Sequence, residues 1–541
     1  MIDCIHDIIV VGSGMTGAHS AQTLVDAGLK VCMLDVGFKD NYYKNIIPKD
    51  DFCAIRKNES NQDKIFLGKQ FESIQLGRVK IGAQLTPGRA HIIKGMNKYL
   101  PIVSNTFSAY ESLAYGGLGS GWGGAAFTFS DPELRAMGLN SNELEKAYNV
   151  INFRIGISGN RDDGSQYCNV KLKNLQSSVT LDSNNLLIYE NYLRNKSKIN
   201  NLGIFMGRSN LAAITEDFNG REKLKYREMS FYDDHGESVY RPWITINELI
   251  KKNNFIYQSA TLVTSYIEKG GIVEVHSFDI NTNEKKVFKC KKLVLASGVL
   301  STARIVLRAA GSDQRLPLLC NSYAYLSAIN LKKIAGSIEN RKTSLSQLFM
   351  FYDKFGNNMD VSTCSLYSYR SLLSFRIIKE MPLAMRDSRL LMRYLLPALS
   401  IIGIHHPERA SDSKYLFLNK DNSRITGDVL HINYKLSKEE TAENKKREWT
   451  IRKSLFKLGL LPLTKQTPKM GASIHYCGTM PFSNIEKSFG LYSNGKLMGS
   501  KNVFVADGSG FKYLPAKGIT LTLMANAHNV ASKIIKKRGF E

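Results

Sequence analysis

Cysteine is scarce in this sequence, and long apolar runs are missing. The eight cysteines form no CxxC pair and no metal-ligand spacing, which argues against a disulfide framework or a structural zinc site. Cys32 and Cys290 lie in or beside apolar, strand-like runs, so we expect buried thiols in a reducing compartment. No uninterrupted apolar run is long enough to cross a bilayer, and a strand follows Met1 too soon to leave room for a signal peptide. These features predict a cytoplasmic protein.

Acidic residues are too few to balance the basic ones. The chain has 73 Lys and Arg against 48 Asp and Glu, a formal net charge of +25. Such an excess favours an anionic partner, whether nucleic acid, an acidic membrane surface or an acidic substrate, although lysines scattered over the surface would give the same total. We expect no nucleic-acid partner, because the chain has no aromatic RNP segment and no zinc-finger spacing.

Length and composition fit a globular protein of more than one domain. The 541 residues are more than one compact core usually holds, so two domains that share a cleft are expected. Hydrophobic residues make up 43% and charged residues 22% of the chain, which is typical of globular proteins.

The N-terminal region has the pattern of a nucleotide-binding βαβ unit. The residue pattern predicts a buried parallel strand at Asp7–Val11 and a helix at 18–27. It also predicts a second strand at 30–34, which ends at Asp35. The motif G-x-G-x-x-G lies between the first strand and the helix, at 12–17. Its glycines permit a tight turn, close approach of the backbone to a pyrophosphate at the helix N-terminus, and close packing of helix on strand. Asp35 stands where an acidic residue would bind ribose hydroxyls.

The fingerprint alone does not distinguish NAD from FAD. If 502–507 is a strand that ends at Asp507, the chain returns to the nucleotide domain after a long excursion. Residues from both chain ends would then contact one ligand, which favours a large, extended cofactor such as FAD.

Further elements complete the expected nucleotide domain. Two strands are expected over 255–275, joined by a Gly270-Gly271 turn. A buried strand at 291–297 leads into a helix at 301–310, and the last helix is expected at 519–534. The dense glycines of 115–126 indicate backbone that approaches something closely.

Taken together, these motifs resemble those of the glucose–methanol–choline (GMC) oxidoreductases. The matching segments are DIIVVGSGMTGAHSAQTLVDAGLKVCMLDVG at 7–37, YGGLGSGWGG at 115–124, LVLASGVLSTARIVL at 293–307, HYCGT at 475–479 and NVFVADGSGF…GITLTLMANAHNVASKI at 502–534. They come in the family's order and with roughly its spacing. The resemblance covers the nucleotide domain well and is faint over 40–105 and 313–400.

The resemblance implies a mixed α/β fold with two domains that alternate along the chain. One is a Rossmann-like FAD-binding domain, and the other is an interleaved substrate domain built on an antiparallel sheet with covering helices. We expect 1–40, 110–130, 205–312 and 470–541 in the FAD-binding domain. We expect 41–109, 131–204 and 313–469 in the substrate-binding domain.

The resemblance also implies a reaction, in which an alcohol gives its hydroxyl proton to a base while its carbon delivers a hydride to flavin N5. His475 occupies the position of the family's base, and an imidazole suits that task near neutrality. The helix that begins near Gly518 would direct its N-terminus at the flavin's pyrimidine edge. The residues expected to contact FAD are Gly12, Ser13, Gly14, Met15, Thr16, Gly17, Asp35, Val36, Gly117, Gly119, Ser120, Trp122, Gly123, Gly124, Ala125, Val263, Ala296, Ser297, Gly298, Asp507, Gly508, Gly518, Ile519 and Thr520.

Two positions depart from the family pattern. The family usually has Asn or His as a second active-site residue where this chain has Gly518. Lys517 or Tyr476 would then substitute, or the chemistry would rest on His475 alone. Some relatives attach flavin covalently through a histidine in the glycine-rich motif, where this chain has Gly121, so we expect non-covalent FAD.

The substrate side is less determined. We expect oxidation of a hydroxyl of a sugar, glycoside or polyol, with O₂, a quinone or a protein as the electron acceptor. Residues 370–404 hold six basic and two acidic residues among many Leu, Ile and Met. This segment is either a helix on an anionic membrane, which would favour a lipid-linked or hydrophobic alcohol, or a pair of core-facing helices that cover the site. A further alternative is a flavin-binding protein without turnover, which the glycine at 518 motivates.

Overall fold

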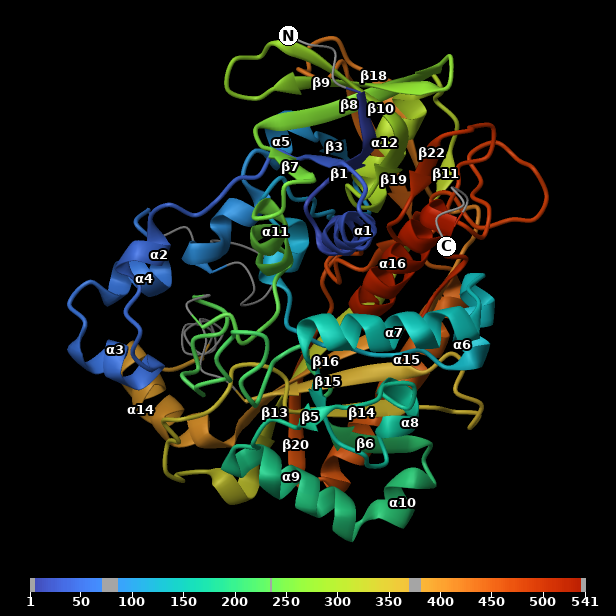
Figure 1. Ribbon diagram of the computed structural model, residues 1–541. Coiled ribbons are helices and arrows are strands. Elements are labelled where there is room, and N and C mark those ends of the chain that lie inside the picture. The colour runs from blue at the N-terminus through green and yellow to red at the C-terminus, as the bar shows by residue number, and fades with distance from the viewer. Residues whose placement is uncertain (1–4, 71–85, 234–235, 369–380, 537–541) are drawn as a thin grey trace.

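The computed structural model describes residues 5–70, 86–233, 236–368 and 381–536. These residues form two halves, with a mainly parallel sheet in the upper half of Figure 1 and an antiparallel sheet in the lower half. The predicted mixed α/β class is confirmed. The first strand and the last helix both lie in the upper half (Figure 1), so the chain leaves this half and returns at its end.

The parallel sheet confirms the predicted βαβ unit. Its strands lie in the order β7 (Phe255–Gln258), β2 (Val31–Leu34), β1 (Ile5–Val11), β10 (Lys285–Leu295) and β22 (Val503–Val505), and each pairs in parallel with its neighbour. Helix α1 (Met15–Asp26) connects β1 to β2, and α16 (Thr520–Lys536) packs against α1. The carboxyl ends of the parallel strands therefore meet at one edge of the sheet.

The glycines between β1 and α1 have different roles. Gly12 has a φ of 97°, and a Cβ there would meet the carbonyl oxygen of Ala296 at 2.8 Å. A Cβ at Gly17 would overlap the carbonyl oxygen of Gly12. At Gly14, by contrast, a Cβ would meet nothing within 4 Å. The first and third glycines are therefore required by packing, whereas the second borders open space.

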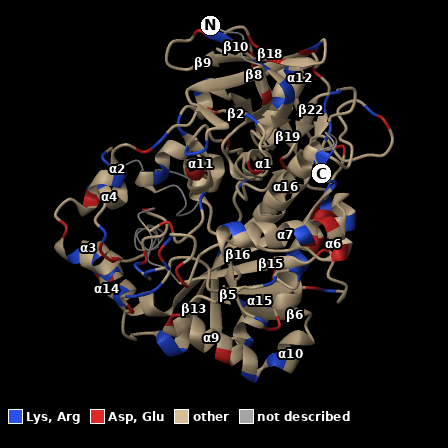
Figure 2. Ribbon diagram, in the orientation of Figure 1, with Lys and Arg blue, Asp and Glu red and all other residues tan. Residues whose placement is uncertain are grey.

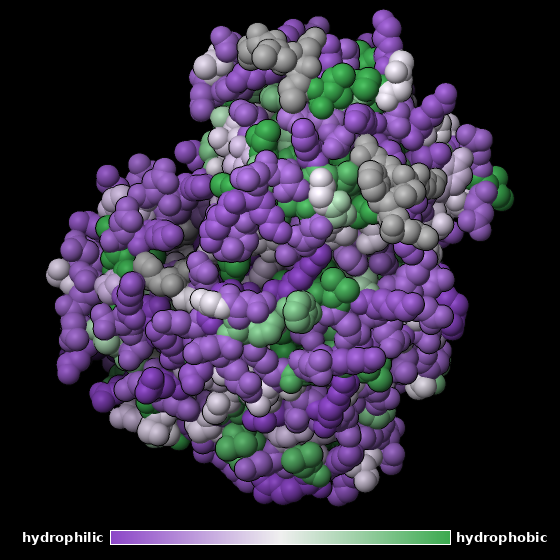
Figure 3. All heavy atoms as spheres, in the orientation of Figure 1, coloured by the Kyte–Doolittle hydropathy of each residue, from purple (hydrophilic) through white to green (hydrophobic). Residues whose placement is uncertain are grey.

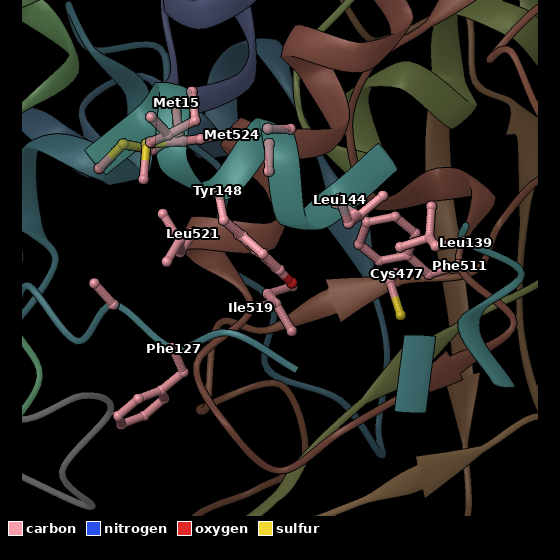
Figure 4. Packing of buried hydrophobic residues seen from close by; sticks show 14 of the residues in the cluster. Met15, Phe127, Leu139, Leu144, Tyr148, Cys477, Phe511, Ile519, Leu521 and Met524 are labelled. Carbon is pink, nitrogen blue, oxygen red and sulfur yellow. The ribbon is translucent and has the colours of Figure 1, made fainter. Parts of the chain in front are cut away.

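A large hydrophobic core fixes the last helix against the first. Figure 4 shows Met15 of α1, Tyr148 of α7 (Ser141–Ile155) and Met524 of α16, which belong to one buried cluster. The hydroxyl of Tyr148 also hydrogen-bonds to Thr522 of α16 at 2.7 Å. This packing positions the N-terminal end of α16.

The region around the Gly270-Gly271 turn differs from the prediction of two strands. The structure has three: β7, β8 (Thr261–Lys269) and β9 (Ile272–Asp279). Ala260, with a φ of 55°, interrupts the extended backbone between β7 and β8. Strand β7 therefore pairs in parallel with β2, while β8 and β9 form an antiparallel hairpin that continues from β10.

The second large sheet is antiparallel and has one core face and one cavity face. Its strands lie in the order β20 (Leu460–Gln466), β13 (Ser322–Asn330), β16 (Leu399–His406), β15 (Ser362–Tyr367), β14 (Leu348–Tyr352) and β6 (Ile204–Arg208). Helices α9 (Ser183–Arg194) and α15 (Lys438–Lys457) contribute to the core under one face. Side chains alternate along each strand, so Cys364 and Leu366 enter this core, while Thr363 and Ser365 lie on the other face.

A smaller sheet lies against the half of the molecule that contains the parallel sheet. We call this half the nucleotide half, because the expected nucleotide-binding motif lies in it. It contains β11 (Leu316–Pro317), β18 (Lys414–Lys420), β19 (Asp428–Tyr434) and β3 (Ile102–Val103), and its core includes α12 (Val299–Ala309). The domain boundaries stay a prediction. Strand β6, which crosses the boundary expected at 204/205, pairs within the antiparallel sheet.

The interpretation of 370–404 as two core-facing helices is wrong for the part that the structure describes. Residues 369–380 lie outside the described residues. Helix α14 (Met385–Leu395) buries only Ser388 and Met392, and 399–406 forms strand β16 rather than a helix. Leu, Ile and Met at helical spacing misled the prediction, because the same residues also fill alternate positions of a strand.

The state of the cysteines and the distribution of surface residues fit the expectations from composition. Of the seven described cysteines all are free, and Cys32 and Cys290 are buried as predicted. Figure 2 shows Lys and Arg on helices and loops of both halves, and Figure 3 shows apolar residues in small separate patches on this face. None of the helices within the described ranges is long and apolar enough to cross a membrane.

Candidate functional site

A cavity of about 780 Å³ joins the two sheets. One wall consists of residues that follow the parallel strands: Gly12 after β1, Asp35 after β2, Ala296 after β10 and Asp507 after β22. The opposite wall comes from β13, β15 and β16 of the antiparallel sheet. Ligands of open α/β sheets bind at the carboxyl ends of the strands, and this cavity begins there.

The cavity wall at the start of α1 has the features of a pyrophosphate site. No side chain caps α1 at Gly14, and the first N–H groups of a helix attract anions. Gly14, Met15 and Thr16 all line the cavity. The open space at Gly14 lets a ligand approach the backbone closely.

Asp35 lies beside this turn. Its Oδ2 accepts hydrogen bonds from Ser13 Oγ at 2.5 Å and from the hydroxyl of Tyr257 at 2.8 Å. Burial raises the pKa of Asp35 to about 6. The carboxylate is therefore mainly ionised at neutral pH and able to accept hydrogen bonds from sugar hydroxyls.

Most residues that the sequence associates with FAD line this one cavity. Three of them do not: Gly17 packs against Gly12, Ser120 donates a hydrogen bond to the carbonyl of Tyr115 at 2.8 Å, and Gly124 lies near Val239. The residues in the wall are Gly12, Ser13, Gly14, Met15, Thr16, Asp35, Val36, Gly117, Gly119, Trp122, Gly123, Ala125, Val263, Ala296, Ser297, Gly298, Asp507, Gly508, Gly518, Ile519 and Thr520.

The carboxylate of Asp507 is already engaged within the protein. Its Oδ1 accepts a hydrogen bond from the backbone N–H of Ser509 at 3.0 Å, and its Oδ2 accepts one from Thr302 at 2.6 Å. A ligand at this part of the wall would therefore meet the backbone of Asp507 and Gly508 rather than a free carboxylate.

Hydrogen bonds around His475 determine which ring nitrogen carries the proton. The amide nitrogen of Asn321 donates to the carbonyl oxygens of His406 at 2.8 Å and Pro515 at 3.1 Å. Those two acceptors fix the orientation of the amide, so the oxygen of Asn321 lies 3.1 Å from His475 Nδ1. An amide oxygen only accepts hydrogen bonds, so Nδ1 carries the proton. The remaining nitrogen, Nε2, is left unprotonated and basic.

His475 also stays neutral over a wide pH range. Burial lowers its pKa to about 4, because a charged imidazolium is poorly solvated in the protein interior. The ring lines the cavity. At neutral pH the protein therefore presents a neutral base there.

The two residues considered as substitutes for a second active-site group are engaged elsewhere. Lys517 does not line the cavity, and its ammonium forms a buried ion pair with Glu133 at 2.5 Å. The hydroxyl of Tyr476 donates to the carbonyl of Gly471 at 2.7 Å and accepts from the N–H of Tyr110 at 3.0 Å. The structure thus gives Lys517 a structural place, which corrects its assignment as a catalytic candidate.

Gly518 lines the cavity just before α16. Its neighbours leave space, since a Cβ would meet its nearest atom, the carbonyl oxygen of Ala125, at 3.6 Å. The backbone there does not require glycine. A residue with a side chain would therefore fit at this position without disturbing the fold.

Sequence reasoning missed the residues of the antiparallel wall. Alternate residues of three strands line the cavity: Tyr323, Tyr325, Thr363, Ser365, Tyr367, Ile401 and His405. The alternation of polar and apolar residues along 362–367 was the available signal. His405 went unnoticed because the segment before it was interpreted as helical.

The antiparallel wall is uncharged, whereas the nucleotide side is not. The charged residues in the cavity wall, Asp35, Glu111, Arg304, Arg308 and Asp507, all belong to the nucleotide half. Arg304 pairs with Glu111 at 2.9 Å, and Arg308 with Asp428 at 2.6 Å. Among the described residues, those that the antiparallel sheet contributes are hydroxyls, an aliphatic side chain and a histidine.

Comparison with known proteins supports the fold. No protein-family model and no curated protein sequence matches the chain. A solved structure does match: the crystal structure of pyridoxine 4-oxidase from Mesorbium loti, at 13% sequence identity and a TM-score of 0.57. The match covers 98% of this chain and 99% of that one. From the first sheet to the last helix, this chain therefore has the fold of that oxidase.

Proposed function

We propose that this chain is a GMC-type, FAD-dependent oxidoreductase that oxidises a CH–OH group of an uncharged, hydroxylated substrate. One observation carries the proposal: a single cavity connects a dinucleotide cradle, at Gly14 and Asp35, to the neutral imidazole of His475. Fold likeness and the sequence resemblance to the GMC oxidoreductases point the same way. We also propose the two-domain division given above, with β6 assigned to the substrate-binding domain.

The cavity fits FAD by its own chemistry. Gly14 and the uncapped N-terminus of α1 suit a pyrophosphate, and Asp35 suits ribose hydroxyls. Val263 of β8 would lie against the adenine. The N-terminus of α16, at Gly518 and Thr520, would lie near the isoalloxazine, where a helix end stabilises negative charge.

The chain's own residues supply the proton chemistry. When bound, FAD supplies the acceptor for the hydride that leaves the substrate carbon. His475 Nε2 accepts the hydroxyl proton, so the O–H and C–H bonds break and a carbonyl forms. Asn321 holds the proton on Nδ1 and thereby keeps Nε2 available.

An uncharged antiparallel wall supports a neutral substrate. Hydroxyl side chains such as Thr363 and Ser365 offer hydrogen bonds, and aromatic rings such as Tyr323 offer flat packing surfaces for a sugar ring. A sugar, glycoside or polyol suits this wall. Acidic or phosphorylated alcohols do not, because no cation of the described antiparallel wall would neutralise them.

An anaerobic substrate screen tests the proposed function. Holoenzyme is mixed with pyridoxine, methyl glucosides, polyols, benzyl alcohol and sugar acids, and bleaching of the flavin absorbance is recorded. Bleaching by neutral alcohols but not by sugar acids is expected, whatever the natural electron acceptor. Bound FAD that no alcohol reduces would instead favour a flavin-binding protein without turnover.

FAD is expected to be bound without a covalent link. Gly121 stands where a flavin-linked histidine occurs in some relatives, and it has no side chain to form the bond. Denaturation and filtration should therefore move all the flavin absorbance into the filtrate. Absorbance that stays with the polypeptide would contradict this prediction.

A second candidate function is the same reaction on a hydrophobic or lipid-linked alcohol, and helix α14 favours it. This helix lies at the periphery of the lower half (Figure 1). Leu390, Leu391 and Tyr394 are 56%, 41% and 47% exposed. Arg386, Arg389 and Arg393 form the neighbouring stripe at helical spacing. Arginines beside exposed apolar side chains suit an anionic bilayer.

Vesicle sedimentation tests the anionic membrane as the occupant of α14. The protein is expected to co-sediment with phosphatidylserine vesicles at low salt and not with phosphatidylcholine vesicles. Replacing Arg386, Arg389 and Arg393 by Gln should weaken binding about 100-fold, at about 1 kcal/mol per arginine. Replacing Lys445, Lys446 and Lys457 of α15 by Gln removes the same charge elsewhere and should have a smaller effect. No co-sedimentation at low salt would contradict the proposal.

A further inference from the structure

His405 is a second histidine in the cavity, on the opposite side from the nucleotide cradle. It lies near the end of β16, with its ring 5.3 Å from that of His475 and nearly parallel to it, at 28°. On the other side, the ring of Tyr323 lies 4.5 Å away. Tyr323 is the cross-strand neighbour of His405. The rings of His405 and His475 are stacked and that of Tyr323 is tilted against His405, and the two contacts hold His405 in place.

The ring nitrogens of His405 are free to bind a ligand. Within the described residues, neither of its ring nitrogens has a hydrogen-bond partner, although the ring lines the cavity. Its cross-strand neighbour on β15 is Thr363, which is 2% exposed and whose hydroxyl has no partner. Buried polar groups are nearly always hydrogen-bonded. Two unsatisfied groups side by side in a cavity wall therefore indicate a polar ligand.

Gly518 lines the same cavity as His475 but has no side chain to offer a substrate. A proton acceptor alone leaves the substrate oxygen without a hydrogen-bond donor as its O–H bond breaks and negative charge develops there. We propose that His405 is a second catalytic residue, whose N–H donates a hydrogen bond to the reacting oxygen of the substrate, with Thr363 binding a neighbouring polar group. This inference rests on the proposed alcohol oxidation.

The closeness of the two histidines supports this division of roles. Two imidazoles this close do not both carry a positive charge readily. Burial, together with the nearby His475, holds the pKa of His405 well below its ordinary value. His405 therefore stays neutral while His475 receives the substrate proton. A neutral imidazole still has one N–H to donate.

Substitution of His405 tests the inference with two separate readouts. His405→Phe keeps a ring in the stack and removes the donor, while His405→Asn and His405→Gln restore an N–H. The first readout is the rate of anaerobic flavin reduction by pyridoxine, methyl glucoside and benzyl alcohol. The second is calorimetric binding of the same alcohols to dithionite-reduced holoenzyme, which cannot accept a hydride.

We expect His405→Phe to slow flavin reduction about 100-fold and to weaken binding about 10-fold, with partial recovery in the Asn or Gln variant. His431→Phe is the matched control, because His431 is also a strand histidine stacked on an aromatic ring, Phe417, at 5.1 Å. It should leave both readouts unchanged.

Three results would overturn the inference. The first is a His405→Phe enzyme that reduces and binds like the wild type, which would leave the alcohol oxidation itself intact. The second is a defect that neither Asn nor Gln relieves, since this would indicate a packing role for the ring. The third is a wild-type holoenzyme that neither binds nor is reduced by any of the alcohols, which would overturn the proposed function together with the inference.

Discussion

His475→Phe is expected to slow reduction of the flavin by substrate by two to four orders of magnitude, the usual contribution of a positioned general base. The ring keeps its volume and its place beside His405, while the basic Nε2 is lost. Stopped-flow measurement of flavin reduction under anaerobic conditions gives the rate. The FAD spectrum and affinity should stay close to those of the wild type. Reduction at the wild-type rate would exclude His475 as the base.

The pH dependence of the wild-type rate checks the same assignment. A base works only in its neutral form, and burial lowers the pKa of His475 to about 4. The rate of flavin reduction should therefore be constant from pH 8 down to about pH 5 and fall only below that, as His475 gains a proton. An inflection near pH 6.5, the ordinary value for histidine, would contradict the buried, neutral state.

Gly14→Val is expected to abolish FAD binding without unfolding the protein. The Cβ at Gly14 would meet no protein atom within 4 Å, and the φ of −64° suits any residue. The added methyl groups would instead occupy the space of the pyrophosphate. Two lost charge-assisted hydrogen bonds, at about 1.5–3 kcal/mol each, weaken binding by about 10²- to 10⁴-fold.

Two measurements separate a loss of FAD affinity from a loss of fold stability: thermal unfolding of the apo protein, and titration of the apo protein with FAD. The unfolding midpoint of the apo Gly14→Val protein should stay near that of the wild type, with a cost of at most about 1 kcal/mol from the poorer N-cap. Gly17→Val is the contrasting variant, because its Cβ would overlap the carbonyl of Gly12; it should fail to fold. A Gly14→Val protein with wild-type affinity would mean that the pyrophosphate lies elsewhere.

The sequence was sufficient for the βαβ unit at the start of the nucleotide half, although not for the strands around Gly270-Gly271. Each of its predictions rested on neighbours in the chain: a β-branched strand, a glycine turn, a helix and Asp35 within one βαβ unit. Such local patterns are read directly from the order of residues. The role of His475 came instead from the resemblance to the GMC oxidoreductases, and it stays a prediction.

The antiparallel wall could not be predicted in this way. His405, Thr363 and Tyr323 come from three strands that pair only after the chain has folded. No short motif connects them, and the apolar residues before His405 fit a helix as well as a strand. The role of Asn321 depends on two carbonyls that are distant in sequence, His406 and Pro515. Pairings at such separations are a property of the tertiary structure.

The position of β22 in the parallel sheet has a consequence for how the protein is made. This strand pairs with β10 and leads into Asp507 and α16, yet it is synthesised long after β1, β2 and β10. Until then the growing chain has its glycine turn but lacks the strand and helix that complete the wall. Pairings of such long sequence separation form slowly. If the cavity holds FAD as proposed, a nascent chain that lacks β22 and α16 has an incomplete site, and the cofactor is captured only after these segments have been made.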